Sequence, residues 1–199
     1  MVLCEGDTEE LAVRYFVARQ WKADGLGSVG LSLRNLQGNL NKIGPFARNC
    51  LDETDVVAVF TLVDLYGMNR VDHPAGDNVD AKVARVKVWL CDQVKHRRCP
   101  PDFFPHVSVH EVEAWILAEG DALSKRLNDP RISPEPDAEL KNFLRPPKKR
   151  LNELFWRSKK TRYAETLDGQ PLFSKMEFQP VYDSCRYFRE FYDSLKRAA

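Results

Sequence analysis

The sequence predicts an α/β fold, in which a parallel, doubly wound sheet of about four strands is followed by an α-helical C-terminal extension. Over the first 120 residues, short apolar runs alternate with helical patterns, and this order is typical of a parallel sheet. Residues 56–63 are almost entirely apolar, as expected of a central strand that is buried on both faces. Residues 121–199 differ, because they combine clustered prolines with the patterns of short helices.

The individual elements follow from the spacing of apolar residues, which recur every second position in strands and every third or fourth in helices. The first helix also has a start signal, since Asp7 and Glu10 have the spacing of a capping box. We expect Asp7, Glu9 and Glu10 to be capping and solvated acids. In the sheet domain (1–120), the predicted elements are strand 2–4, helix 7–24, edge strand 28–33, helix 36–47, strand 56–63, helix 79–94, strand 103–109 and a helix that begins near residue 111. In the extension (121–199), which we expect to pack on that domain, the predicted helices are 135–143, 148–158 and 182–196.

The composition is that of an ordinary globular chain, with 43% hydrophobic and 30% charged residues. No segment approaches the ~18 consecutive apolar residues that a membrane helix needs, so we expect no membrane contact. The N-terminus lacks the basic and apolar regions of a signal peptide. The five cysteines are scattered and form no C-x-x-C motif, which argues against a disulfide framework and for a reducing compartment. A cytoplasmic location is therefore predicted.

The charge is unevenly distributed although the net charge is only +1. Residues 145–162, which we call the basic strip, carry a net charge of +7, and this leaves −6 on the rest of the chain. Phe155, Trp156 and Tyr163 are interleaved with these bases or follow them. Such a pattern suits nucleic acid, through phosphate neutralisation and base stacking. It is equally compatible with a solvated helix whose aromatic side chains pack inward. The expected nucleic-acid contacts are Lys148, Lys149, Arg150, Arg157, Lys159 and Lys160.

Acidic residues follow three of the predicted strands: Glu5 the first, Asp64 the third, and Glu111 with Glu113 the fourth. Because sites in open α/β sheets form at the carboxyl ends of the strands, these side chains should converge at one edge. Carboxylates that lie close together repel one another and need a cation or a proton. Oxygen ligands favour Mg²⁺ or Mn²⁺ over zinc, and such ions hold phosphate oxygens and activate water. Taken singly, each acid could instead be a helix cap.

Three motifs together carry a resemblance to a known family. They are Cys-Glu-Gly-Asp-Thr-Glu at 4–9, Leu-Val-Asp-Leu-Tyr-Gly at 62–67, and His-x-x-x-His-Glu-x-Glu-Ala-Trp at 106–115. The first 120 residues resemble the Toprim domain of topoisomerases, primases and OLD-type nucleases. More closely, they resemble a Toprim-like family of unknown function that is encoded beside ABC-type ATPases in bacterial anti-phage loci. The resemblance implies a nuclease effector that depends on an ATPase partner, and some relatives cut tRNA.

The resemblance also implies roles for individual residues. Glu5 matches the Toprim glutamate, which serves as an acid/base or a metal ligand, and Asp64 matches the first acid of the Asp-x-Asp motif. Tyr66 stands where that motif has its second acid, so one ligand of a standard Toprim site is missing. The narrower family pattern implies that Glu111 or Glu113 replaces it. Tyr66 itself either contacts substrate or fills the sheet edge.

We therefore expect a Mg²⁺- or Mn²⁺-dependent nuclease that acts on DNA or RNA as the effector of an ATPase-linked anti-phage system. Glu5 and Asp64 would hold the metal ion, Glu111 would complete its shell, and Glu113 or His110 would assist proton transfer. His110 could also be a strand-end histidine bonded to the backbone. Two rivals remain: a non-catalytic module that docks on an ATPase, and a phosphotransferase for small molecules. A homodimer is compatible with each of them.

Overall fold

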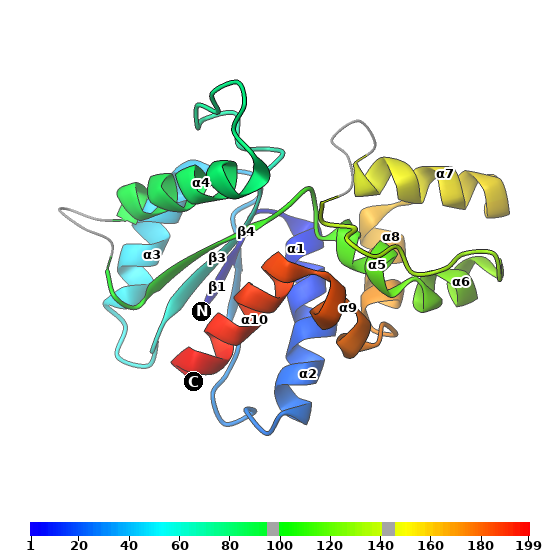
Figure 1. Ribbon diagram of the computed structural model, residues 1–199. Coiled ribbons are helices and arrows are strands. Elements are labelled where there is room, and N and C mark those ends of the chain that lie inside the picture. Colours follow the sequence, from blue (N-terminus) through cyan, green and yellow to red (C-terminus); the bar gives the residue numbers. More distant parts are fainter. Residues whose placement is uncertain (95–99, 141–145) are drawn as a thin grey trace.

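The computed structural model describes residues 1–94, 100–140 and 146–199, and it has the predicted α/β fold (Figure 1). Its four strands run parallel in one sheet, in the order β2-β1-β3-β4. The order along the sheet reverses between β1 and β3, and in open α/β sheets ligands bind outside the carboxyl ends of the strands at such a point. The strands are β1 (Val2–Cys4), β2 (Leu33–Asn35), β3 (Val59–Asp64) and β4 (Phe103–Ser108).

Helices cover both faces of the sheet (Figure 1). Alternate side chains of a strand point to opposite faces, so Leu3 lies in one core cluster while Cys4 lies in the other. The Leu3 side packs on α3 (Ile43–Leu51), which follows the 3₁₀ turn η2 (Leu40–Lys42), and on α4 (Val79–Val94). The Cys4 side packs on one continuous helix and on the C-terminal helix. These are α1 (Asp7–Ala12), the π-helical segment η1 (Val13–Val17) and α2 (Ala18–Ala23), and α10 (Arg186–Ala198).

The C-terminal region is helical and shares the core of the first helix. The rings of Phe16, Trp115 and Phe188 meet there, with a centroid distance of 4.7 Å between Trp115 and Phe188 and 5.5 Å between Phe16 and Phe188. The extension is therefore built onto the same hydrophobic core as the N-terminal helix. Its remaining helices are α5 (Glu113–Glu119), α6 (Asp121–Leu127), α7 (Pro147–Lys159), α8 (Glu165–Phe173) and α9 (Phe178–Ser184).

Several predicted boundaries in the sheet domain are wrong. The edge strand covers Leu33–Asn35 and not 28–33, because β1 offers only three residues for pairing and Val2 already lies opposite Leu33. The second helix begins at Ile43 and not near residue 36, since Gln37 and Gly38 have left-handed backbone angles that a helix excludes. The predicted strand 56–63 starts only at Val59, where β4 begins to pair with it.

The extension also departs from the prediction. Residues 135–140 form turns instead of a helix, with Asp137 at φ +56°, and 141–143 lie outside the described residues. The single helix predicted at 182–196 is two helices, α9 and α10, because Cys185 between them has an extended backbone (φ −108°, ψ 97°). Helix α8 was not predicted, since Pro171 within it resembles a helix break.

The oxidation state of the cysteines and the length and polarity of the helices concern the predicted cellular location. Cys4, Cys50 and Cys185 are buried free thiols. Cys91 is disulfide-bonded, so the expectation that the cysteines stay reduced is wrong at this position. Among the described residues, no helix is both long and apolar enough to cross a membrane.

Gly44 allows α3 to pack closely on α4, and this makes a testable prediction. A Cβ atom at position 44 would collide with the backbone carbonyl oxygen of Gln93. We expect Gly44→Ala to lower the free energy of unfolding by about 1–3 kcal/mol, the usual cost of overpacking, as measured by urea denaturation. The matched control is Gly30→Ala, where an added Cβ meets no atom within 4 Å. Equal stability of the two variants would contradict this packing.

Candidate metal and phosphate site

A cavity of about 220 Å³ lies at the carboxyl ends of the strands, at the point where the strand order reverses. We call it the acidic cavity, because seven carboxylates and one lysine line it together with Gly6, Thr8 and Gly38. Its charged residues are Glu5, Asp7, Glu9, Asp64, Glu111, Glu113, Lys148 and Glu165. The four acids that the sequence predicts to converge, at positions 5, 64, 111 and 113, are all among them.

Glu5 is positioned by the turn that follows β1. Its Oε2 accepts a hydrogen bond from the backbone N–H of Asp64 at 2.9 Å, and this bond joins the ends of β1 and β3. Gly67 makes room for the carboxylate, since a Cβ there would lie 3.3 Å from Glu5 Oε1. Burial raises the pKa of Glu5, and the hydrogen bond from Asp64 partly opposes this effect.

Glu9 belongs to the site, which corrects the expectation of a solvated acid. Gly6 is the N-cap of α1, so Glu9 occupies the third helical position and accepts a hydrogen bond from the Gly6 N–H at 2.9 Å. The predicted capping pair of Asp7 and Glu10 is therefore shifted by one residue. The side chain is buried, and burial raises the pKa of Glu9 to about 7, with further contributions from the charges of Glu5 and Glu165.

Asp64 and Glu113 are the carboxylates with the strongest perturbation. Asp64 ends β3, and its Oδ1 is buried without a hydrogen-bond partner among the described residues. Burial raises the pKa of Asp64 well above its usual value, and the nearby charges of Glu9 and Glu113 raise it further. Glu113 opens α5 and is 3% exposed. Burial also raises its pKa well above the usual value, followed by the charge of Glu111.

Glu111 and Lys148 connect the cavity to the extension. Glu111 Oε2 accepts a hydrogen bond from the backbone N–H of Lys148 at 3.0 Å, at the start of α7. The Lys148 ammonium forms an ion pair with Glu165, which also accepts a hydrogen bond from the Thr8 hydroxyl at 3.0 Å. The pKa of Lys148 is raised, mainly by this bond to Glu165. Helices α7, α8 and α1 thus meet at the mouth of the cavity.

The histidines of the third sequence motif, His106 and His110, do not line the acidic cavity, and neither does Tyr66. His110 is fully buried at φ +71°, a strained backbone for a non-glycine residue, and burial lowers its pKa. His106 packs in the sheet core against Phe191, where burial lowers its pKa to about 3. The side chain of Tyr66 is 53% exposed.

The cavity has the chemistry of a hard-cation site without an assembled coordination sphere. Within residues 1–94, 100–140 and 146–199, no group of three or more His, Cys, Asp or Glu side chains is arranged to hold a metal ion. All donors in the lining other than the lysine are oxygens, and such a set suits Mg²⁺ or Mn²⁺. The unpartnered Asp64 Oδ1 and the raised pKa values also fit a cation, since a positive charge would satisfy both.

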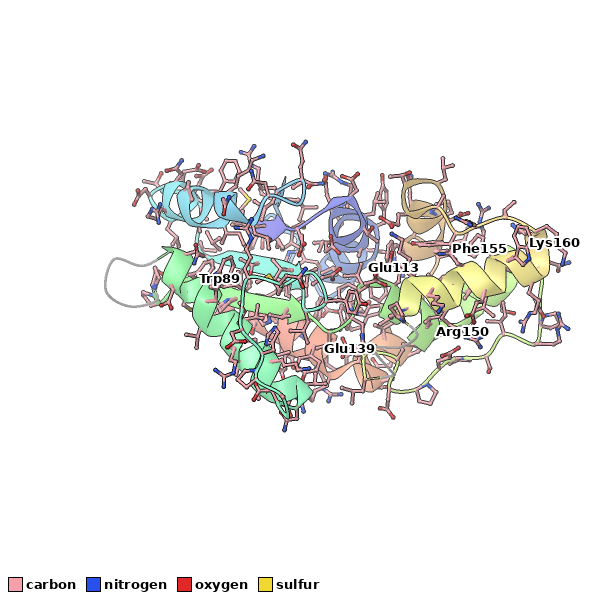
Figure 2. The ribbon with its side chains drawn as sticks, turned by 90° about the horizontal axis from the view of Figure 1, so that it is seen from above. Trp89, Glu113, Glu139, Arg150, Phe155 and Lys160 are labelled. Carbon is pink, nitrogen blue, oxygen red and sulfur yellow. The ribbon has the colours of Figure 1, made fainter. Side chains whose placement is uncertain are left out.

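The basic strip divides into different environments. Lys148 lines the acidic cavity, and Arg150 and Arg157 form ion pairs with Glu135 and Asp129 at 2.8 and 3.0 Å. The exposed bases of the strip are Lys148, Lys149, Arg157, Lys159, Lys160 and Arg162, while Arg145 lies outside the described residues. Two of the three aromatics, Phe155 and Tyr163, pack inward, whereas Trp156 is 58% exposed. Figure 2 places Glu113 near the start of α7 and Lys160 at its far end.

The polar side chains of the site that sequence reasoning missed are Asp7, Thr8, Glu9 and Glu165. Thr8 and Glu9 lie within the N-terminal motif. In a capping box the glutamate stands three residues after the N-cap, so assigning the N-cap to Gly6 would have identified Glu9 as the capping glutamate. Glu165 had no sequence signal, because 157 residues separate it from its partner Thr8.

Comparison with known proteins identifies a family and no function. A family described as "Domain of unknown function (DUF4276)" matches residues 4–196. No curated protein and no solved structure matches the chain. The match extends from the end of β1 into α10 and so includes both the acidic cavity and the helical extension. The chain therefore belongs to the DUF4276 family.

Proposed function

We propose that this protein is a divalent-metal-dependent phosphodiesterase that cleaves nucleic acid. The observation that carries this proposal is the convergence of seven carboxylates on one cavity, at the point where the strand order reverses. A fold does not hold so many like charges close together in a merely structural role without a cation or protons to balance them. Perturbed pKa values of this kind are typical of functional sites.

A bound Mg²⁺ or Mn²⁺ ion would be held by Glu5 and Asp64, with Glu111 completing the set. When bound, such an ion would polarise a phosphoryl oxygen and activate a water for attack. Glu113 is the alternative third ligand, and it is more deeply buried than Glu111.

The chain's own groups supply the remaining chemistry. Among the described residues, Lys148 is the one cation in the lining of the acidic cavity, and it would attract the phosphate and help to balance its charge. Glu165 and Thr8 hold the lysine at the cavity mouth. Glu9, with a pKa of about 7, is protonated in about half of the molecules at neutral pH, and a group with such a pKa is suited to protonate the leaving oxygen. His110 does not line the cavity, so we assign proton transfer to the glutamates.

The resemblance of residues 1–120 to Toprim-like nucleases supports this proposal, since Glu5 and Asp64 occupy the matching positions at the ends of β1 and β3. On that resemblance, we propose a cytoplasmic effector of an ATPase-linked anti-phage system, with DNA or RNA, tRNA included, as substrate. Trp156 and the exposed lysines of the basic strip are the proposed contacts to the strand.

A second candidate is a non-catalytic module that docks on an ATPase partner. Two observations favour it: Tyr66 stands where Toprim sites have a second acid, and the described carboxylates form no ready coordination sphere. The two candidates differ in whether the acidic cavity binds a metal ion.

Titration with Mn²⁺ separates the two candidates. We expect the wild-type protein to bind Mn²⁺ at submillimolar concentrations, as monitored by electron paramagnetic resonance. Glu5→Gln should weaken binding at least ~10-fold, since changes around a metal site commonly cost 10–100-fold in affinity. Glu53→Gln, at an exposed position, is the charge-matched control. If neither wild type nor Glu5→Gln binds at millimolar Mn²⁺, the docking module is the better account.

A further inference from the structure

A second, smaller cavity of about 70 Å³ lies beside α7 and shares no residue with the acidic cavity. We call it the arginine pocket, because Arg131, Arg150 and Arg157 line it. Most of the remaining lining is aliphatic, and within the part of the chain that the structure describes Glu135 is its one carboxylate. Figure 2 shows Arg150 on the side of α7 opposite Phe155, which packs into the core. The pocket nevertheless borders that core, because its aliphatic lining residues belong to the same hydrophobic cluster as Phe155.

A buried carboxylate holds two of the arginines in place. Asp129 is 4% exposed, and it accepts hydrogen bonds from Arg131 Nε at 2.8 Å and Arg131 Nη2 at 3.0 Å. It also accepts one from Arg157 Nη2 at 3.0 Å. These bonds hold the pKa of Asp129 below its usual range, so the carboxylate stays ionised. The guanidinium groups thus come together from a loop and a helix 26 residues apart and are oriented before any ligand arrives.

Each arginine keeps donors for a ligand. Arg157 uses only Nη2 for Asp129, and Arg150 uses Nε for Glu135 at 2.8 Å and Nη1 for Glu153 at 3.8 Å. A guanidinium has five N–H donors, so several remain on the three groups. The three positive charges are offset by Asp129, Glu135 and Glu153, which pair with them. An anion would therefore be bound by the guanidinium N–H donors that remain and not by an excess of positive charge.

The size and chemistry of the pocket select the anion. A water needs about 10–15 Å³ of cavity volume, so 70 Å³ accommodates a tetrahedral oxyanion. Converging planar guanidinium groups match the paired oxygens of phosphate, and the aliphatic floor strengthens the attraction by lowering the local dielectric. We propose that the arginine pocket binds a phosphate group.

The position of the pocket suggests the source of this phosphate. Arg157 lies nine residues after Lys148 on α7, which is a rise of about 14 Å and about two and a half turns, so the two side chains leave opposite sides of the helix. A nucleic-acid strand whose scissile phosphate lies in the acidic cavity would therefore have to pass across α7, over at least about four nucleotides, to place a further phosphate at the arginine pocket. This assignment to a strand rests on the proposed function, whereas the phosphate site itself does not.

The test measures binding of three probes to the full chain in the presence of EDTA: inorganic phosphate, a nucleoside monophosphate and a 12-nucleotide single strand. We expect Arg131→Gln and Arg157→Gln to weaken phosphate binding at least ~10-fold by isothermal titration calorimetry. Arg162→Gln removes the same charge from an exposed position and should change it less than twofold. Arg157→Lys keeps the positive charge but lacks the planar guanidinium group, so it should also weaken phosphate binding. If circular dichroism shows Arg157→Gln to be unfolded, Arg157→Lys takes its place.

The outcomes are distinct. Wild-type affinity in both Arg131→Gln and Arg157→Lys, or an equal loss in Arg162→Gln, would overturn the site. If the single strand binds at least ~10-fold more tightly than the monophosphate and loses this advantage in Arg131→Gln, the ligand is a strand phosphate. If the monophosphate binds as tightly, the pocket serves free phosphate monoesters, and the strand assignment is overturned. Glu5→Gln, which tests the proposed function, should leave phosphate binding in EDTA unchanged.

Discussion

Asp64→Asn will make the metal-free protein more stable and abolish the nuclease activity that we propose for it. Asp64 is buried beside several other carboxylates, and its raised pKa means that folding opposes its ionised form. Asparagine has the same shape and no charge to desolvate. We expect the free energy of unfolding at pH 7.5 to rise by about 0.5–2 kcal/mol, as is common when a strained functional site is relieved. Activity should fall at least ~100-fold, since changes outside the ligand shell alone cost 10–100-fold.

Two measurements on the same preparations check this prediction. Thermal unfolding in EDTA reports stability, and cleavage of labelled DNA and RNA strands in Mg²⁺, with the ATPase partner if it is required, reports activity. Asp55→Asn is the matched control, because Asp55 is exposed just before β3. A lower melting temperature for Asp64→Asn would mean that the aspartate stabilises the fold. Undiminished cleavage would remove Asp64 from the metal site.

The stability of the metal-free protein will fall between about pH 5 and pH 8, and Mg²⁺ will restore it at the upper end. A carboxyl group whose pKa is higher in the folded state binds more protons there than in the unfolded chain, so stability decreases as pH rises. For Glu9 this window runs from the usual value of 4.5 to about 7. The shift corresponds to a loss on the order of 3 kcal/mol. Asp64 and Glu113 act in the same direction.

Glu139 also has a raised pKa, so its contribution to the pH dependence of stability must be distinguished from that of Glu9. Its carboxylate accepts hydrogen bonds from the backbone N–H groups of Tyr187 and Phe188 at the start of α10, and burial raises its pKa to about 7. We therefore compare urea denaturation at pH 5, 6.5 and 8 for the wild type, Glu9→Gln and Glu139→Gln. Both variants should have a shallower pH dependence. Saturating Mg²⁺ (about 100-fold above its Kd) should add about 2.7 kcal/mol at pH 8, and this gain should shrink in Glu9→Gln but persist in Glu139→Gln. A pH-independent wild type would contradict the raised pKa values.

The order of strands and helices was accessible from the sequence, because apolar periodicity is a local property of the chain. The buried run that became β3, the helix α4 and the acids at the strand ends all followed from residues within a few positions of each other. Strand lengths were less accessible. The edge strand β2 is short because β1 is short, and only the pairing of Val2 with Leu33 decides where it lies.

The sequence by itself determined the fold class and the four acids at positions 5, 64, 111 and 113, because the carboxyl ends of parallel strands must lie along one edge. Only the tertiary structure decided that Glu9 is buried with them and that Lys148 and Glu165 close the cavity. It also decided that Arg131 joins Arg150 and Arg157 around a pocket of their own. The physical reason is the same in each case: these contacts join segments far apart in the chain, and burial sets the charge state of a group only after those segments have packed.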